Sequence, residues 1–268
     1  MAPLLTVESL TVRYRARRFG GGDGAMTALD SLSFTVAAGS TLAIVGESGS
    51  GKSTLALCLA CLERPTAGRI EFGGRELTAL REPELRAVRP QIQLVFQDPA
   101  GSLNPRLTAL EIVSEPLMVQ GKLTSAERGA RARGLLERVG LSPGMAGRAP
   151  AEFSGGQRQR LAIARALAIE PRLLILDEAL SALDASVQAQ IANLLLDLQD
   201  SSGFAYVFIT HDLRMAARVA DAIAVLERGR IVEQGAAEQI VRHPEHAATR
   251  ALVAATLRFE PPRERAGG

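Results

Sequence analysis

The chain has 268 residues, of which 47% are apolar, and its formal net charge is +2 at pH 7. This length allows one domain with a substantial core, and the near-balance of charge gives no strong attraction to nucleic acid or anionic lipid. No apolar run approaches the roughly 20 residues of a membrane-spanning helix. No basic segment precedes a long apolar stretch at the N-terminus, so we expect no secretion signal and a cytosolic location.

Short apolar runs bounded by turn signals recur along the chain, which is typical of strands buried in an α/β sheet. In chain order, the sequence predicts strands over 4–7, 32–36, 42–45, 69–72, 92–96, 173–176, 205–209, 222–226 and 230–233. Helical patterns fill the gaps over 54–62, about 107–119, 125–139, 155–168, 185–200 and 213–219. Three pairs indicate antiparallel connections between neighbouring strands: Ala38-Gly39, Gly73-Gly74 and Arg228-Gly229.

No strand is predicted between Gln97 and Phe153. We interpret residues 98–153 as an inserted helical subdomain that leads into the helix beginning near residue 154. The tail at 258–268 contains two prolines and alternating charges, and we expect it to be disordered. The pattern predicts an α/β fold with a mixed core sheet and flanking helices, an antiparallel β subdomain and an inserted α-helical subdomain.

A glycine-rich loop separates the predicted strand over 42–45 from the next helix. It consists of Gly46, Glu47, Ser48, Gly49, Ser50, Gly51, Lys52 and Ser53, with Thr54 opening the helix. Glycines let backbone N–H groups turn inward around phosphate oxygens, and the positive end of the helix strengthens that anion site. Lys52 can reach the terminal phosphates, and the Ser53 hydroxyl can ligate Mg²⁺. The loop predicts a P-loop NTPase core, but many unrelated NTPases share it.

A second glycine-rich string opens the helix that follows the insertion: Ser154, Gly155, Gly156 and Gln157. Its N–H groups and hydroxyl could also face phosphate. Taken alone, it is better explained as a helix N-cap with a tight turn.

Two acids end the predicted strand over 173–176. Ionised carboxylates after four buried residues need a cation or a hydrogen-bonding partner, although they could also be solvated. Beside a phosphate loop, Asp177 is the candidate holder of Mg²⁺, and Glu178 is placed to polarise an attacking water. Phosphoryl transfer requires mainly positioning and charge stabilisation, so a few fixed groups suffice.

Other polar side chains at strand ends admit more than one interpretation. Gln97 ends the strand over 92–96, where its amide could reach Mg²⁺ or a water. His211 follows the strand over 205–209, and a lone histidine there more often caps or packs. Asp184 is a candidate N-cap for the next helix, and Tyr14 could simply be an exposed residue at a strand end.

Several further features have a structural explanation. Cys58 and Cys61 lie among leucines on a predicted helix, and we interpret them as small buried hydrophobes rather than a redox or metal pair. The glycine run at 20–22 precedes no helix, so flexibility is its expected role. His243 and His246 lack further ligands nearby and are expected at the surface.

Together, the glycine strings at 46–53 and 154–157 resemble the ATP-binding cassette family, and the second matches its signature sequence. The resemblance covers about residues 4–257. It implies one ATPase domain that binds ATP and Mg²⁺. It also implies that the signature string of one subunit closes over nucleotide held by the phosphate loop of another, so that each site is shared by two subunits.

The same resemblance assigns roles to individual residues. It implies that Glu178 is the catalytic base, that Asp177 holds Mg²⁺, and that His211 contacts the terminal phosphate and Glu178. Gln97 would link the nucleotide state to rotation of the insertion. The resemblance also implies that Asp184 helps to join the two sites of a dimer. Tyr14 would stack on adenine, with Phe19 as a competing stacker.

The residues of several segments narrow the resemblance to the ATPases of dipeptide, oligopeptide and nickel importers. The similar segments are 96–106, 153–160 and 181–190, together with His243-Pro244. Phe153 replaces a leucine common in the larger family, and Ala179-Leu180 replaces a proline–threonine pair, without removing a catalytic group. The sequence of residues 244–250 differs more from the corresponding sequences of the importers.

The resemblance implies an ATP-hydrolysing subunit that powers solute import. It would pair with an identical or different cassette and dock through its insertion, including 101–106, on membrane permease subunits at the cytoplasmic face of the inner membrane. A separate solute-binding protein would deliver solute, and no nucleic acid would take part. The alternative is an ATPase of a soluble complex such as the phosphonate carbon–phosphorus lyase system. A DNA-repair or translation ATPase is disfavoured, because the chain has no coiled-coil insertion or second cassette.

Overall fold

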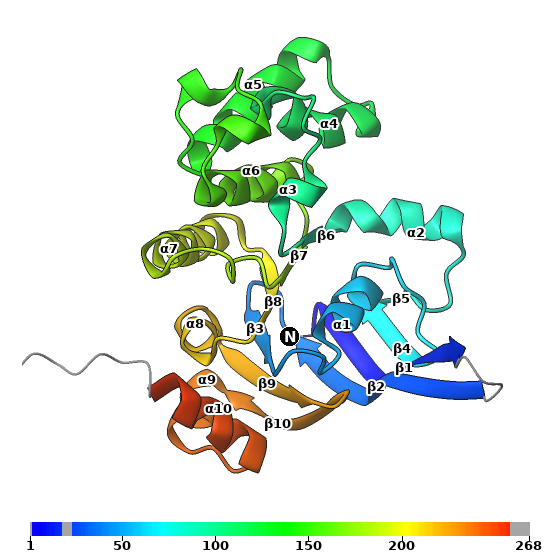
Figure 1. The fold of residues 1–268 in the computed structure, drawn as a ribbon. Coiled ribbons are helices and arrows are strands. Elements are labelled where there is room, and N and C mark those ends of the chain that lie inside the picture. Colours follow the sequence, from blue (N-terminus) through cyan, green and yellow to red (C-terminus); the bar gives the residue numbers. More distant parts are fainter. Residues whose placement is uncertain (1, 18–22, 258–268) are drawn as a thin grey trace, which may run out of the picture.

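The computed structural model describes residues 2–17 and 23–257 and contains two sheets surrounded by helices (Figure 1). The larger sheet has the order β10 (Arg230–Ala236), β9 (Ala222–Glu227), β3 (Thr41–Val45), β8 (Ala205–Thr210), β7 (Leu173–Asp177) and β6 (Ile92–Val95). Its strands run parallel except for β10, which is antiparallel to β9. The smaller sheet is antiparallel, in the order β2 (Asp23–Val36), β1 (Leu5–Arg17), β4 (Ala67–Phe72) and β5 (Arg75–Glu76).

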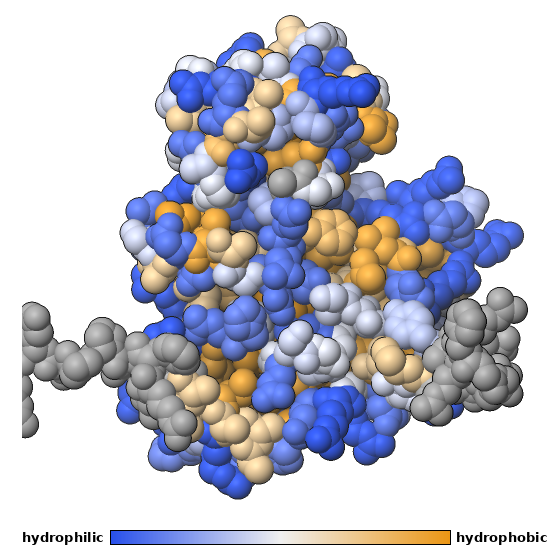
Figure 2. Space-filling model, viewed as in Figure 1, coloured by the Kyte–Doolittle hydropathy of each residue, from blue (hydrophilic) through white to orange (hydrophobic). Residues whose placement is uncertain are grey.

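The helices are α1 (Lys52–Leu59), α2 (Glu82–Val88), α3 (Pro99–Ser102), α4 (Ala109–Gln120), α5 (Ser125–Arg138), α6 (Gly155–Leu167), α7 (Ala185–Ser202), α8 (Leu213–Val219), α9 (Ala237–Arg242) and α10 (Ala247–Leu257). Short 3₁₀ turns occur at Arg89–Gln91, Pro143–Met145 and Pro150–Glu152. Helices α3 to α6 form the green group set apart from the sheets in Figure 1. The space-filling view shows an indentation below this group, where hydrophobic side chains come to the surface (Figure 2).

The central strands are buried on both faces, and alternate residues enter two different hydrophobic clusters. Successive side chains of a strand point to opposite faces. On β7, Leu174 and Leu176 join the cluster that contains helices α4 to α8, whereas Leu173 and Ile175 join the cluster that contains α1 and the antiparallel sheet. This two-sided burial explains why the strand is a continuous apolar run. It also leaves only the strand ends available for polar chemistry.

Residues at the ends of helices in this group cap those helices. Thr108 caps α4 and Thr124 caps α5, and in each case the glutamate three residues later completes a capping box. Gly121 ends α4 in the left-handed conformation. The described chain between Gln97 and Phe153 contains no strand, as the sequence predicts.

The predicted strands and the six predicted helices are all present. Most boundaries shift by a few residues, but β1 continues to Arg17 and β2 begins at Asp23, so both are much longer than the predicted strands over 4–7 and 32–36. The expected antiparallel connection at Ala38-Gly39 is wrong. This turn joins β2 to β3, which belong to different sheets, whereas Gly73-Gly74 and Arg228-Gly229 do connect antiparallel neighbours. The sequence did not predict β5, α2, α3, α9 or α10.

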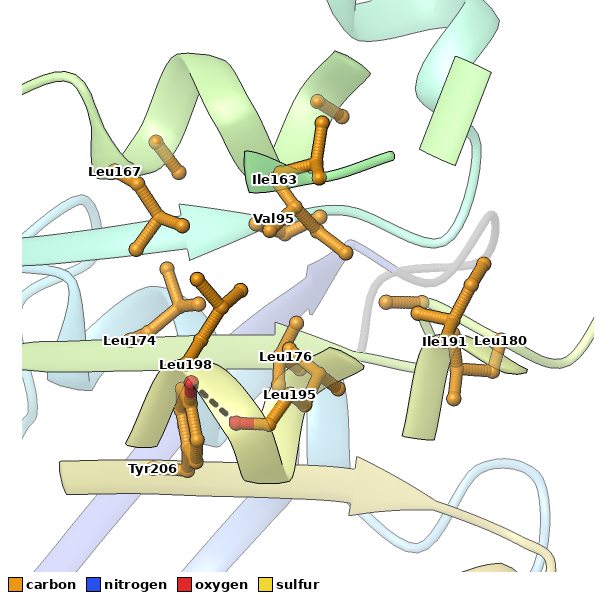
Figure 3. Packing of buried hydrophobic residues seen from close by; sticks show 14 of the residues in the cluster. Val95, Ile163, Leu167, Leu174, Leu176, Leu180, Ile191, Leu195, Leu198 and Tyr206 are labelled. Carbon is orange, nitrogen blue, oxygen red and sulfur yellow. Dashed lines mark hydrogen bonds between the residues drawn. The ribbon is translucent and has the colours of Figure 1, made fainter. Parts of the chain in front are cut away.

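Tyr206 illustrates how the core accommodates a polar atom. Its ring lies between β8 and α7, and its hydroxyl donates to the Leu195 carbonyl oxygen at 3.0 Å (Figure 3). Burial raises the pKa of this phenol well above its usual range, so the hydroxyl stays neutral and remains a donor.

We predict that Tyr206→Phe lowers the free energy of unfolding by about 1 kcal/mol, because a buried hydrogen bond is lost. Tyr14→Phe is the matched control, since Tyr14 is exposed at the surface and should change stability by less than about 0.5 kcal/mol. Denaturant unfolding of both variants measures the difference. Equal stability of the two variants would show that the hydroxyl bond contributes nothing.

Candidate functional site

The phosphate loop lies between β3 and α1, and its glycines meet two requirements. Gly49 and Gly51 have φ angles of 80° and 107°, which residues with a Cβ rarely adopt. A Cβ on Gly46 would lie 2.2 Å from the Leu226 carbonyl oxygen on β9. The loop therefore needs glycine for its own backbone path, in addition to any need for close approach by phosphate.

Lys52, the first residue of α1, is 4% exposed although it is charged. Its Nζ donates to the carbonyl oxygens of Gly46 at 2.9 Å and Glu47 at 2.8 Å, and lies 3.4 Å from Glu178 Oε1. A buried ammonium group needs compensation of this kind. The contacts hold the cation between the phosphate loop and the end of β7.

Asp177 ends β7 with a buried carboxylate whose Oδ1 has no hydrogen-bond partner among the described residues. Desolvation raises the pKa of this group, and the Ser53 hydroxyl acts in the opposite direction. Ser50 Oγ is a second buried oxygen without such a partner in the described structure. Because buried polar atoms are normally hydrogen-bonded, both oxygens indicate a polar ligand. A carboxylate and a hydroxyl fit Mg²⁺, which prefers oxygen ligands.

Glu178 is held in place at both its backbone and its side chain. It has a φ of 47°, and its N–H donates to the Ile209 carbonyl oxygen on β8 at 2.9 Å. Its carboxylate is 18% exposed and lies between two cationic or potentially cationic groups, with Oε1 at 3.4 Å from Lys52 Nζ and Oε2 at 3.6 Å from His211 Nδ1. The His211 side chain is 54% exposed, so it can reach a ligand from the solvent side.

Gln97 is connected to the backbone of Glu178 through Ser181. Gln97 Nε2 donates to Ser181 Oγ at 3.2 Å, and Ser181 Oγ donates to the Glu178 carbonyl oxygen at 2.9 Å. The structure therefore brings together Lys52, Asp177, Glu178, His211 and Gln97 around the end of β7. Ser181 was missed as a site residue, although its position three residues after Glu178 is typical of a turn-stabilising hydroxyl.

The signature string forms the N-terminus of α6. Ser154 Oγ accepts from the Gln157 N–H at 3.3 Å, and Gln157 Oε1 accepts from the Ser154 N–H at 3.0 Å, which completes a capping box. The predicted N-cap is thus confirmed. Among the described residues, no hydrogen bond or ion pair joins residues 154–157 to residues 46–54.

The loop after Glu178 packs against that string. Asp184 caps α7 by accepting from the Val187 N–H at 3.0 Å, as predicted. A Cβ on Gly156 would lie 2.4 Å from Val187 Cγ1, and one on Gly155 would lie 3.3 Å from Leu183 Cδ2. The two glycines therefore also allow α6 to approach this loop and α7 closely.

Two predicted features remain apart from this cluster. Tyr14 lies on β1 opposite Met26, partly exposed, and its stacking role stays a prediction. Phe19 and the glycine run at 20–22 lie outside the described residues, as does the tail at 258–268.

Cys58 is buried in α1, as predicted, whereas Cys61 is only partly buried against the same cluster and lies beyond the end of that helix at Leu59. Desolvation raises the pKa of Cys58 to about 12 and that of Cys61 to about 11, so both remain thiols at neutral pH. In residues 2–17 and 23–257, no group of three or more His, Cys, Asp or Glu side chains could hold a metal ion by itself. The same part of the chain contains no helix with the length and apolar character needed to cross a membrane.

Comparison with known proteins gives consistent matches. The ABC transporter family model matches residues 29–181. A probable peptide ABC transporter ATP-binding protein, y4tS from Sinorhizobium fredii, is 51% identical over 98% of this chain and 75% of its own length. The glutathione import ATP-binding protein GsiA of Escherichia coli is 46% identical over 98% of this chain, which spans only 42% of that protein.

Solved structures show the same architecture. The dimeric post-hydrolysis state of the ATP-binding cassette MJ0796, bound to ADP and Pi, matches with a TM-score of 0.77 and 32% identity over 87% of this chain and 98% of that one. CbiO1 from Clostridium perfringens, part of the ABC transporter complex CbiONQ, matches with a TM-score of 0.79 and 29% identity over 91% of this chain and 92% of that one.

The P-loop fold, the arrangement of polar groups around β7 and these matches agree. The chain belongs to the ABC transporter family, as an ATP-binding and ATP-hydrolysing subunit.

Proposed function

We propose that this chain hydrolyses ATP to power import of a peptide-like solute or nickel through a membrane permease. The observation that carries the chemistry is the position of Glu178 between Lys52 and His211 at the end of β7. Similarity over 98% of the chain to ATP-binding proteins named for peptide transport and glutathione import supports the direction of transport. In this role the chain would work at the cytoplasmic face of the inner membrane, with a solute-binding protein outside.

In the resting site, Lys52 is shared between two loop carbonyls and Glu178. Phosphate oxygens of ATP carry more charge than these carbonyls and would compete for the ammonium group. Release from Lys52 would leave the Glu178 carboxylate free to accept a proton from water, and His211 would face the terminal phosphate. Mg²⁺ held by Ser53 and Asp177, with Gln97 at its edge, would neutralise charge on the phosphates.

Gln97 connects the site around Glu178 to the helical insertion. It lies two residues before Pro99, where α3 begins, and its amide binds the Ser181 hydroxyl that also holds the Glu178 carbonyl. If nucleotide draws Gln97 away from Ser181, the helical group after it must follow. We therefore interpret residues 4–257 as one ATPase domain in which the segment 98–153 is a helical insertion that responds to nucleotide.

The insertion also offers a surface for the permease. A cavity of about 340 Å³ lies between β6 and helices α4 and α6. Its rim includes Phe96, which is 40% exposed, and Val119, which is 81% exposed. Exposed apolar side chains beside a groove are typical of a protein-binding surface. We propose that a cytoplasmic helix of a permease subunit binds here, next to residues 101–106.

We further propose that two subunits share each nucleotide. The signature string at 154–157 and the phosphate loop lack direct contacts within the described chain, which supports this arrangement. The second subunit would be an identical or a different cassette.

We predict that Glu178→Gln lowers the rate of ATP hydrolysis by at least about 100-fold, because the general base is lost. ATP binding should remain, since the amide no longer competes for Lys52, and the protein should accumulate as a nucleotide-bound dimer. Phosphate release and size-exclusion chromatography with ATP measure the two effects. Glu137→Gln, on the exposed surface of α5, is the control, and near-normal turnover of Glu178→Gln would refute the assignment.

A mixing experiment tests the shared site. Lys52→Ala and Ser154→Arg should each be inactive alone, because every site in the pure protein has one defective half. In an equal mixture, a mixed dimer of identical cassettes has one intact site, so activity should return to about a quarter of the wild-type value. A mixture that stays inactive, although cross-linking shows mixed dimers, would mean that each chain supplies its whole site.

Val119→Asp should weaken binding to the permease without loss of hydrolysis by the free subunit, because the side chain is exposed and does not belong to the polar groups around Glu178. We expect the fraction of the chain that sediments with membranes to fall several-fold relative to the control Arg133→Asp, which is on the exposed surface of α5. Unchanged sedimentation would argue against this docking surface, and a wild-type chain that never associates with membranes would favour a soluble complex.

A further inference from the structure

A second cavity lies on the opposite side of the domain from the phosphates. It has a volume of about 740 Å³, within the range of small-molecule sites. One wall is α5, and the other is formed by the segments just before β7 and β8, including Arg172 and Phe204. These segments lie at the amino ends of the strands, whereas Asp177 lies at the carboxyl end of β7, about 16 Å away for a five-residue strand.

The charges in this cavity are unbalanced. Arg131, Arg138 and Arg172 line it together with a single carboxylate, that of Glu170. Arg131 forms an ion pair with that carboxylate, with 2.8 Å between Arg131 Nη2 and Glu170 Oε1. Arg138 donates only to the Ser201 and Ser202 hydroxyls, and the Arg172 guanidinium lies over the Phe72 ring. Within the described chain, neither Arg138 nor Arg172 has a carboxylate within 4 Å.

The remaining wall is apolar and includes Leu135, Leu167 and Phe204, which are buried in the hydrophobic core. Gly134 lies beside them in the interior of α5, where glycine costs about 1 kcal/mol relative to alanine. A Cβ at this position would have no atom within 4 Å. Neither backbone conformation nor packing therefore requires the glycine, and its effect is to leave the cavity open.

We propose that this cavity binds a small organic anion, with its carboxylate, sulfonate or phosphate group between Arg138 and Arg172 and its aryl or alkyl body against Leu135 and Phe204. Charge-assisted hydrogen bonds from guanidinium groups suit such an anion, and the apolar wall would provide the remaining affinity. The site is separate from the nucleotide and lies beyond the transport role proposed above. Arg131–Glu170 and Arg138–Ser202 already connect α5 to the core across it, and the ligand would add a third connection.

The probe for the test is 8-anilinonaphthalene-1-sulfonate, an aryl anion whose fluorescence rises on binding, with saturating Mg-ADP present to block the nucleotide site. We expect saturable binding that weakens by about tenfold or more in the double variant Arg138→Gln/Arg172→Gln, because hydrogen bonds to a charged group are lost. Arg133→Gln is the matched control, since Arg133 lies on α5 but does not line the cavity. Equal affinity in all three proteins would overturn the proposal.

Gly134→Leu provides a second variant that leaves every arginine in place. Leucine favours a helix more than glycine does, so the fold is retained while the side chain fills the cavity, and probe binding should again weaken by about tenfold. Competition distinguishes the contribution of the anionic group from that of the apolar body. The anion 1-naphthalenesulfonate should displace the probe, and the uncharged 1-naphthalenemethanol should displace it poorly. Equal displacement by both, or unaltered binding to Gly134→Leu, would show that no anion site exists here.

Discussion

A lysine with almost no solvent contact is the constraint around which the site is built. The cost of burying the Lys52 ammonium group is offset only because two loop carbonyls and the Glu178 carboxylate converge on it. This convergence fixes the phosphate loop, the start of α1 and the end of β7 relative to one another. The same three contacts are those that a triphosphate would compete for. In the proposed mechanism, the substrate would replace the interactions that hold these three segments together.

The segment that follows β7 connects this cation to the rest of the molecule. Within a few residues it holds the Glu178 carbonyl through Ser181, caps α7 through Asp184, and places Leu183 and Val187 against the glycines of the signature string. The close approach of Gly156 to Val187 leaves little room for α6 and α7 to move independently. Movement at the end of β7 would therefore be passed to the signature string of the same chain, which in the proposed dimer serves the nucleotide of the other subunit.

The features that could be predicted from the sequence are those determined by short stretches of chain. The phosphate loop, the paired acids at 177–178 and the caps at Ser154 and Asp184 depend on a few adjacent residues, and continuous apolar runs identify strands buried on both faces. The prediction at Ala38-Gly39 is wrong because strand pairing depends on more than the residues of the turn. A two-residue turn contains no information on whether the next strand pairs with the last one or enters another sheet.

Contacts between distant segments also escaped prediction. Ser181 binds Gln97 across 84 positions of sequence and also binds the Glu178 carbonyl. The short helix α2 lies in a charged stretch without apolar periodicity. The open space beside Gly134 also depends on distant segments, so only the folded chain shows it. The helix α10 is rich in alanine, and its burial against α8 and β9 depends on tertiary contacts.

The capping box at the start of α6 has a consequence for reversibility. In this cap Ser154 Oγ and Gln157 Oε1 accept from backbone N–H groups, so the hydroxyl hydrogen of Ser154 and the amide NH₂ of Gln157 are not used by it. A cap of this kind contributes about 1 kcal/mol to its helix, and a phosphate that accepts hydrogen bonds from these donors would leave that contribution in place. Closure of two subunits over a nucleotide would therefore not require α6 to lose its cap, and reopening in each cycle would return the helix to the same capped state.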